Sequence, residues 1–350
     1  MPFLKALQDV SAGNIKIAQR DYQETGLIPI VDQGKSLIAA FTDNAASAIK
    51  TDGPHIVFGD HTRAIKYIDF PFAMGADGVK VLRAGAGFNP KYLYYYLRSR
   101  NIPNLGYSRH FKLLKELKVP RPALDEQQRI ASILDHADSM CTKRREQLAH
   151  LDTLPQSIFC EMFTHLRDSA PLDELGQVIT GKTPPTASAE YFQGAIPFIT
   201  PGDLGRNKPA QRYLSDEGAR FSRLVSPGST FVCCIGATIG KIDTATTTCA
   251  FNQQINAVQW GPRITPEFGR EALISRRGVI IEAGSSTTLP LLPKSRFAKI
   301  AIPVASEAEQ AIFSQHISAV RRMRSKILIE VEALDRLFAS LQSRAFRGEL

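Results

Sequence analysis

The sequence contains one segment twice, and this repeat constrains the fold more than any other feature. Pro120 and Pro303 lie 183 positions apart, and the dipeptides Glu126-Gln127 and Glu309-Gln310 follow them at the same spacing. Many matches in one register indicate a duplicated structural unit. Further identities at this offset are Met140 with Met323, Leu151 with Leu334, Leu154 with Leu337, Ser157 with Ser340 and Phe163 with Phe346.

The segments before these repeats also match, at a smaller offset. Residues 7–13 (LQDVSAG) resemble 175–181 (LGQVITG), and 26–29 (GLIP) resemble 194–197 (GAIP), both 168 positions later. Because the offset grows from 168 to 183, insertions lie inside the globular segment. The expected order is globular domain 1–118, spacer helix 119–167, globular domain 168–301 and spacer helix 302–350.

Both helical segments carry apolar residues in alternating steps of four and three, the seam of a coiled coil. The two helices share the end next to the second globular domain, so they are expected to pair antiparallel about a pseudo-two-fold axis. Pro155 is expected to kink the first helix near its end. Seam residues are Ile130, Leu134, Leu148 and Leu151 in the first helix and Ile317, Val320, Val331 and Leu334 in the second.

The globular segments show strand patterns. Residues 230–236 (TFVCCIG) and 241–248 (KIDTATTT) alternate with a period of two, which favours β-strands. The expected fold class is α+β, with two tandem domains that hold small sheets. Two long helices, pairing as an antiparallel coiled coil, separate these domains.

The charge balance favours a polyanionic partner. The chain has 43 Lys and Arg against 34 Asp and Glu, a formal net charge of +9. Such a surface binds phosphate backbones through counterion release. For each candidate DNA contact, a solvated surface charge is the alternative. The candidates are Lys35, His61, Arg63, Tyr107, Arg109, His110 and Lys112 in the first domain, and Lys182, Thr183, Arg206, Asn207, Lys208, Lys241 and Arg296 in the second.

Two motifs with catalytic associations fail on their context. Residues 176–183 fit the phosphate-loop pattern GxxxxGK[ST], but Pro184 and Pro185 follow at once and oppose the helix that this motif requires. Asn89-Pro90-Lys91-Tyr92 is similar to the NPPY signature of adenine methyltransferases but lacks its second proline, and we interpret it as the turn that starts a helix. We therefore expect no catalytic residue in the chain.

The remaining features point to the cytoplasm. The first residues lack the pattern of a signal peptide, and no run of about 18 apolar residues could span a membrane. The five cysteines form no CxxC pair and no zinc-binding spacing, so we expect reduced thiols and no metal site.

With these residues in view, the whole chain resembles the specificity subunit of type I restriction–modification systems. The resemblance is carried by 181–204, by the helix entrances 120–127 and 303–310, and by 59–82 and 250–259. It implies that each globular domain is a target-recognition domain that reads one part of a split site in double-stranded DNA. It also implies that the helices act as a ruler and dock modification (methyltransferase) subunits, which restriction subunits join. No cofactor is implied for this chain.

Two other functions remain open from the sequence alone. One is a self-contained DNA methyltransferase or NTPase, against which the incomplete motifs argue. The other is a coiled-coil scaffold that does not bind DNA. Binding to random DNA that weakens steeply with salt would separate the specificity subunit from the scaffold.

Overall fold

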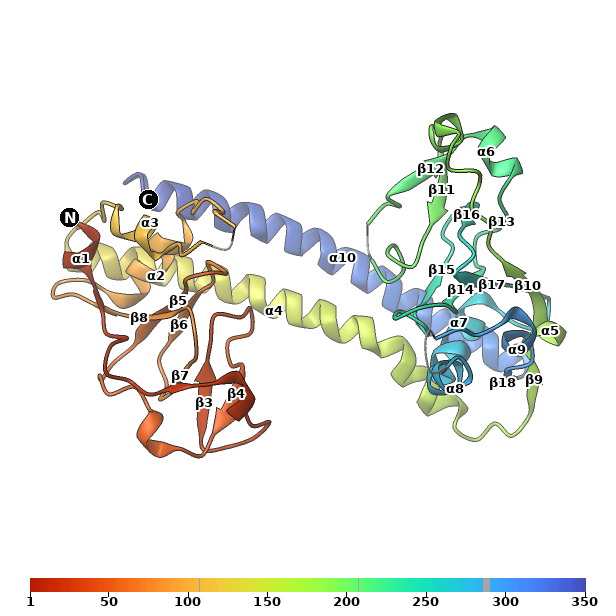
Figure 1. Ribbon diagram of the computed structural model, residues 1–350, viewed down its shortest axis with the longest axis horizontal. Helices are drawn as coiled ribbons and strands as arrows, with labels where there is room; N and C mark the ends of the chain where they lie inside the picture. Colours follow the sequence, from red (N-terminus) through yellow and green to blue (C-terminus); the bar gives the residue numbers. More distant parts are fainter. Residues whose placement is uncertain (107, 207, 286–289) are drawn as a thin grey trace. The chain divides into compact units, whose positions relative to one another are not determined.

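The computed structural model describes residues 1–106, 108–206, 208–285 and 290–350 (Figure 1). The chain divides into two compact units. Unit 1 comprises Met1–Arg145 and Ile329–Leu350, and unit 2 comprises Glu146–Leu328. Each unit therefore contains one globular domain with a part of each long helix. Within the described residues, no helix is long and apolar enough to cross a membrane.

The globular part of unit 1 holds two four-stranded sheets. The first has the order β1-β8-β5-β6 and the second the order β2-β7-β3-β4. The strands are β1 (Leu7–Asp9), β2 (Lys16–Ile17), β3 (Ile28–Val31), β4 (Ala40–Thr42), β5 (His55–Gly59), β6 (Ile65–Ile68), β7 (Ala73–Gly75) and β8 (Val79–Ala84). The helices are α1 (Phe3–Ala6), α2 (Pro90–Arg98) and α3 (Phe111–Lys115), with 3-10 turns η1 (Gln19–Asp21) and η2 (Ala45–Ser47).

Unit 2 repeats this design. Its four-stranded sheets have the orders β10-β17-β14-β15 and β12-β11-β16-β13, and β9 pairs with β18. The strands are β9 (Ser169–Pro171), β10 (Gly176–Thr180), β11 (Ile196–Ile199), β12 (Arg212–Leu214), β13 (Leu224–Val225), β14 (Thr230–Cys233), β15 (Ile242–Thr244), β16 (Cys249–Phe251), β17 (Ile255–Trp260) and β18 (Ala301–Pro303). The helices are α5 (Leu172–Leu175), α6 (Asp216–Arg220), α7 (Pro266–Ser275), α8 (Arg277–Ala283) and α9 (Lys294–Ala298), with the 3-10 turn η3 (Ala189–Phe192).

The two globular parts differ mainly in one outer strand. In unit 1, β2 runs parallel to β7, whereas in unit 2 the corresponding place beside β16 is taken by β13, which runs antiparallel. β2 precedes β3 in the chain, but β13 follows β12. The predicted α+β class is confirmed, and strands form within both predicted segments, as β14 within 230–236 and β15 within 241–248.

Local sequence signals explain where the helices begin. Asn89 caps α2 by accepting a hydrogen bond from the Tyr92 amide, and Pro90 is the first helical residue. Proline is suited to that position because its missing N–H has no partner there in any helix. Residues 89–92 are therefore a helix start, as predicted. The buried face of α2 supplies aromatic side chains to the core of unit 1, among them Tyr92 and Tyr95.

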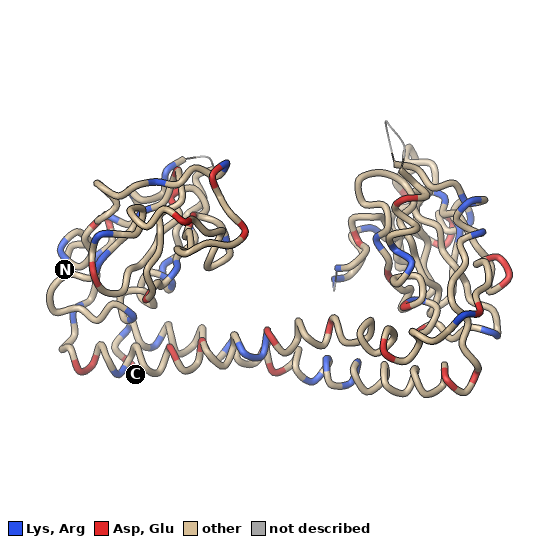
Figure 2. Tube along the Cα trace, turned by 90° about the horizontal axis from the view of Figure 1, so that it is seen from below, with Lys and Arg blue, Asp and Glu red and all other residues tan. Residues whose placement is uncertain are grey.

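The long helices are α4 (Leu124–Phe163) and α10 (Glu307–Ala345). A capping box starts α10, since the Ser306 amide donates to Glu309 Oε2 at 2.9 Å and the Glu309 amide donates to Ser306 Oγ at 3.3 Å. α4 continues through Pro155 to Phe163. Figure 2 shows both signs of charge along the two helices.

Contacts within each unit show that α4 and α10 pair antiparallel, as predicted. In unit 1, Ile130 near the start of α4 and Ala345 at the end of α10 belong to one hydrophobic cluster. In unit 2, Phe159 near the end of α4 packs on Phe313 near the start of α10, with ring centroids 5.8 Å apart. Of the eight seam residues, Leu148 and Leu334 are half-buried, and the others, Ile130, Leu134, Leu151, Ile317, Val320 and Val331, are buried.

Candidate nucleic-acid interface

Three connections in unit 1 form what we name loop cluster 1: residues 32–39 between β3 and β4, residues 60–64 between β5 and β6, and residues 101–110 between α2 and α3, with Tyr107 left aside. The Thr62 hydroxyl donates to the Gln33 carbonyl at 2.5 Å, which joins the first two connections. Arg63 Nη1 donates to the Ile102 carbonyl at 2.9 Å, which joins the second to the third.

His110 holds this cluster together from inside. Its side chain is fully buried, and Nδ1 donates to the Asp60 carbonyl at 2.8 Å. Nε2 accepts from the Leu105 amide at 3.0 Å, so the ring is the neutral tautomer with its proton on Nδ1. Both ring nitrogens are therefore used inside the protein. The prediction that His110 contacts DNA needs correction, because the side chain positions the loops and has no exposed donor.

The other predicted residues of the first domain fall into two groups. Lys35, Arg109 and Lys112 are exposed on or beside loop cluster 1. His61 and Arg63 are half-buried, and Arg63 adopts a left-handed backbone conformation with φ of 64° while its guanidinium braces the loops. Tyr107 lies outside the described residues. Lys35, Arg109 and Lys112 are thus the members of this set whose side chains are open to solvent.

In unit 2, what we name loop cluster 2 is formed by residues 200–211 between β11 and β12, with Asn207 left aside, by 234–241 between β14 and β15, and by the turn 252–254 between β16 and β17. The first two connections correspond to those after β3 and β5 in unit 1, and the turn at 252–254 corresponds to the turn between β7 and β8. The Asn252 amide donates to the Ile199 carbonyl at 3.0 Å, and the Cys234 amide donates to the Gln254 carbonyl at 2.8 Å. Lys241 Nζ donates a hydrogen bond to the Pro201 carbonyl at 3.5 Å. The turn at 252–254 therefore joins the 234–241 connection to the end of β11, where the next connection begins. In unit 1 the β7–β8 turn makes the matching bond, since the Asp60 amide donates to the Gly78 carbonyl at 2.6 Å.

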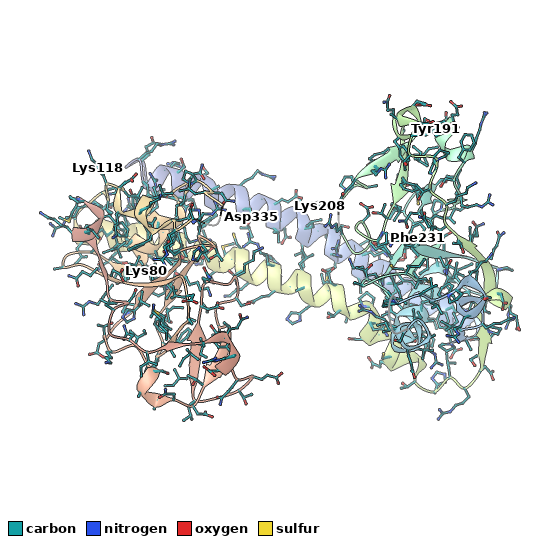
Figure 3. The ribbon with its side chains drawn as sticks, in the orientation of Figure 1. Lys80, Lys118, Tyr191, Lys208, Phe231 and Asp335 are labelled. Atoms are coloured by element: carbon teal, nitrogen blue, oxygen red, sulfur yellow. The ribbon has the colours of Figure 1, made fainter. Side chains whose placement is uncertain are left out.

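The predicted residues of the second domain are mostly gathered here. Lys182, Arg206 and Lys208 are exposed, and Figure 3 shows Lys208 on the 200–211 loop. The Thr183 hydroxyl donates to Gln253 Oε1 at 2.6 Å, which attaches residues 182–183 to the cluster. Asn207 lies outside the described residues. Arg296 is apart from the cluster, since it lies on α9 and donates to the Ala283 carbonyl at 3.0 Å.

The phosphate-loop pattern at 176–183 forms no phosphate-binding loop. Residues 176–180 are strand β10, paired with β17 along its whole length. The Gly181 amide donates to the Ile255 carbonyl and the Lys182 amide to the Phe251 carbonyl. A phosphate loop needs free backbone amides at these positions and a helix after them, and neither is present. Lys182 remains available to solvent as a side chain.

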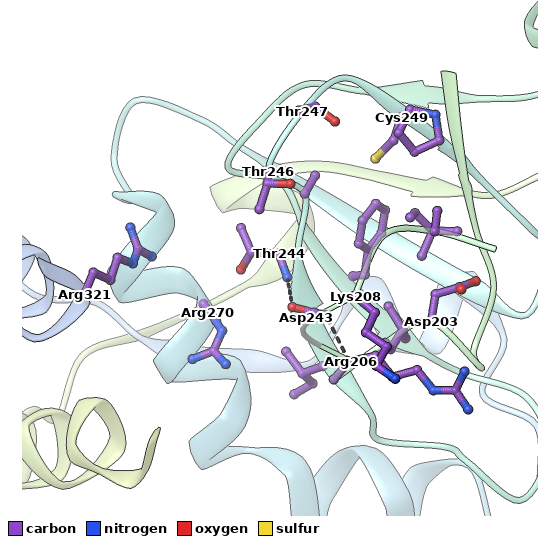
Figure 4. Close-up of a pocket in the computed structure, with 18 of the residues that line it drawn as sticks. Asp203, Arg206, Lys208, Asp243, Thr244, Thr246, Thr247, Cys249, Arg270 and Arg321 are labelled. Atoms are coloured by element: carbon purple, nitrogen blue, oxygen red, sulfur yellow. Dashed lines mark hydrogen bonds between the residues drawn. The ribbon is translucent and has the colours of Figure 1, made fainter. Parts of the chain in front are cut away.

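A cavity of about 800 Å³ lies beside loop cluster 2 and is lined by charged residues of both signs (Figure 4). Asp243 accepts from the amides of Gly205 and Thr244, each at 2.8 Å. Glu267 pairs with Arg321 at 2.7 Å, and burial raises the pKa of Glu271, which lies against Arg270. A further ion pair joins Arg324 to Asp152 at 2.6 Å. In the described part of the chain, no group of three His, Cys, Asp or Glu side chains is arranged to hold a metal ion.

Sequence analysis did not identify Gln33 as a structural residue, although it accepts hydrogen bonds from both Thr62 and the His61 amide. Nothing in its local sequence marks it, because its role depends on the approach of a turn 28 residues away. The role of the turn at 252–254 was not predicted either. In the sequence, the segment 250–259 was distinguished only by its resemblance to target-recognition domains.

Comparison with known proteins identifies the family. The model of the family described as the type I restriction modification DNA specificity domain matches the chain twice, over residues 3–150 and 168–333. The chain belongs to this family. Members of the type I DNA specificity family supply sequence recognition, and the repeat seen in the sequence corresponds to two copies of the family domain.

Individual relatives agree with this assignment. The chain is 23% identical over 321 residues to the specificity subunit of a type I restriction enzyme of Escherichia coli. The aligned region covers 84% of this chain and 79% of the relative. It shares its fold with the S subunit of a type I restriction-modification system from M. genitalium, with a TM-score of 0.62, 16% identity and coverage of 99% and 95%. A structure concerned with complex assembly and conformational transition of the type I system aligns with a TM-score of 0.54 at 17% identity, covering 98% of each chain.

Proposed function

We propose that loop clusters 1 and 2 each read one half of a bipartite site in double-stranded DNA. The observation that carries the proposal is that the connections after β3 and β5 in unit 1 and those after β11 and β14 in unit 2 occupy corresponding places in the fold, while the exposed side chains on them differ. A shared framework gives both domains the same way of approaching a groove, and different side chains give them different base preferences.

The positions of the exposed cations agree with DNA binding by both loop clusters. Lys35, Arg109 and Lys112 surround loop cluster 1, and Lys182, Arg206 and Lys208 surround loop cluster 2. Lysine and arginine at loop tips contact phosphates, and arginine or lysine also donates to guanine O6 and N7 in the major groove. In both units the loops are cross-linked by hydrogen bonds, so the cations are held on a preorganised surface.

The globular domains are proposed to extend over 1–118 and 168–301, with spacers 119–167 and 302–350. Backbone pairing between the first and last residues of each globular domain supports these limits. The first domain closes where Pro2 bridges to Lys118, and the second closes where β9 pairs with β18. Each spacer helix starts within a few residues of this closure, at Leu124 and Glu307. The spacer helices are then available to set the distance between the half-sites.

The chain is the recognition subunit of its complex and leaves methylation and cleavage to partner subunits. Modification subunits, and restriction subunits that join them, are the proposed protein partners. The proposed location is the cytoplasm, which agrees with five cysteines that are all free thiols. The engaged amides of Gly181 and Lys182 argue against an NTPase.

Salt-dependent DNA binding tests the proposal against a scaffold without DNA binding. Affinity of the full chain with its modification subunit should fall steeply with salt. The variants Lys35→Ala and Lys208→Ala should each reduce the slope of log K against log salt by about 1, the change expected for one lost phosphate contact. Lys5→Ala removes an exposed cation outside both clusters and should leave the slope unchanged. Equal slopes for all four proteins would refute the assignment of the clusters.

A further inference from the structure

The loop between β3 and β4 exposes two consecutive apolar side chains. Leu37 is 48% exposed and Ile38 is 37% exposed. Both lie within loop cluster 1, two and three positions after the exposed Lys35. Isolated exposed apolar residues are common, but an adjacent pair on a loop tip leaves apolar area in water that a ligand can cover.

Hydrogen bonds fix the backbone of the β3–β4 loop, although these two side chains are exposed to solvent. The Gly34 amide donates to Asp32 Oδ1 at 2.7 Å, and Lys66 Nζ donates to the Asp32 carbonyl at 2.8 Å. At the far side of the loop, the Ala39 amide donates to the Ile30 carbonyl at 2.9 Å and closes the hairpin. The loop is therefore anchored at both ends, and little ordering free energy is lost when a ligand covers its tip.

The corresponding loop of unit 2 differs in its apolar side chain. In residues 200–211, Leu204 is only 2% exposed, whereas the cations Arg206 and Lys208 are exposed. The first loop therefore presents the apolar pair beside the exposed Lys35, whereas the second loop presents the cations Arg206 and Lys208 and buries its leucine. Packing within the domain does not require exposed apolar atoms in the first loop. A ligand that contacts the loop would give these exposed side chains a role.

We propose that Leu37 and Ile38 read the 5-methyl group of a thymine in the half-site bound by loop cluster 1. Among the bases of unmodified DNA, only thymine presents a methyl group in the major groove, and apolar side chains recognise it by direct contact. Lys35 on the same loop brings a cation to the neighbouring phosphates. This inference rests on the proposed function and adds the chemical identity of one base pair, A·T, to it.

The test replaces thymine with uracil, which lacks only the methyl group. Each thymine of the selected first half-site is changed singly to deoxyuridine, and binding by the full chain with its modification subunit is measured. At one position the wild type should bind about fourfold more weakly, the factor expected for loss of one buried methyl-sized group. The Leu37→Ala and Ile38→Ala variants should bind the thymine and uracil sites with nearly equal affinity.

Two controls separate this inference from the function on which it rests. Leu27 is 78% exposed but lies before β3, at the end of that strand opposite to the loop, so Leu27→Ala should keep the fourfold preference. Lys35→Ala should weaken binding to thymine and uracil sites equally. Loss of binding in Lys35→Ala without any thymine preference in the wild type would overturn the inference and leave the proposed function standing.

Other outcomes also decide the matter. If Leu37→Ala weakens thymine and uracil sites equally, the side chain acts as a wedge between bases and does not read the methyl group. If Leu37→Ala impairs assembly with the modification subunit and leaves DNA preference intact, the pair forms a protein-docking surface. Either result overturns the proposal. Because both side chains are exposed, the alanine variants should fold normally, which circular dichroism and the melting temperature check.

Discussion

Gln127 and Gln310, 183 positions apart in the chain, make the same three hydrogen bonds in the two units. Gln127 Oε1 accepts from the Asn89 amide at 2.9 Å, and its Nε2 donates to the carbonyls of Gly87 and Pro122. Gln310 Oε1 accepts from the Thr265 amide at 2.8 Å, and its Nε2 donates to the carbonyls of Arg263 and Ala305. Asn89 and Thr265 are the N-cap residues of α2 and α7.

Each glutamine thus fastens a spacer helix to the main helix of its globular domain. Both side chains are buried, with exposures of 0% and 1%. Gln127→Ala should therefore remove the partner of the Asn89 amide and of two carbonyls and destabilise unit 1 by about 1–3 kcal/mol. Faster amide hydrogen exchange in α2, with exchange in α7 unchanged, is the expected measurement. Gln128→Ala, at the exposed neighbouring position, should change neither helix.

The ion pairs at the two helix–domain joints have opposite polarity. In unit 1, Arg98 of α2 pairs with Asp138 of α4 at 2.8 Å. In unit 2, Glu267 of α7 pairs with Arg321 of α10 at 2.7 Å, and Arg321 stands 183 positions after Asp138. The framework is therefore repeated while the charges on it are exchanged.

Charge reversal at one joint should be rescued by reversal of its partner. Glu267→Arg alone and Arg321→Glu alone place like charges together and should each destabilise unit 2 by up to about 1 kcal/mol, since the pair is partly exposed. The double variant should recover most of this loss, as measured by hydrogen exchange in α7 in a double-mutant cycle. Arg322→Glu, at an exposed site on the same helix, should show no coupling to Glu267→Arg.

The cysteines should differ sharply in reactivity. Burial raises the pKa of Cys234 and of Cys249 to about 12. A raised pKa keeps the thiol protonated below that pH, so at pH 8 the reactive thiolate is scarce at both positions. Cys160 is the exposed cysteine. Iodoacetamide at pH 8 should label Cys160 first by mass spectrometry, and rapid labelling of Cys234 in the folded chain would contradict this description.

The repeat made much of this architecture predictable. The constant offset of 183 and the heptad seams predicted two matched helices and their antiparallel pairing. Those signals are strong because burial repeats along many residues of a helix. The same repeat placed Gln127 opposite Gln310 in the alignment, but the role of the pair became clear only from the caps of α2 and α7, which no local pattern links to the spacer helices.

The loop clusters were harder to predict because burial there depends on distant segments. His110 looks like a loop histidine beside Arg109, yet it is buried, with Nδ1 bonded to Asp60 of the β5–β6 turn and Nε2 to the Leu105 amide of its own loop. Leu37 and Ile38 look like core residues in the sequence, yet the hairpin that contains them leaves both exposed. The exchange of strand β2 for β13 likewise arises from sheet pairing that the sequence pattern does not encode.

The spacer helices should set the preferred gap between half-sites. Insertion of one heptad after Leu148 and one after Val331, equivalent positions in the two seams, keeps both seams in register. It lengthens each helix by about 10 Å, or about three base pairs, and rotates one half-site by roughly 100° around the duplex. Selection from DNA libraries with random spacers should yield a longer gap and weaker binding, because the DNA must twist. An unchanged gap in a folded variant would show that the helices are not the ruler.

The central claim, that each globular domain reads its own half-site, is tested most directly by exchanging one domain. Residues 1–118 are replaced with the matching domain of a relative that has a different target, and modified bases are mapped in DNA of cells that carry the hybrid chain and its modification subunit. One half of the methylated site should change to that of the relative, while the other half stays as in the wild type. If both halves change together, or neither does, the two domains do not read DNA independently and the account is contradicted.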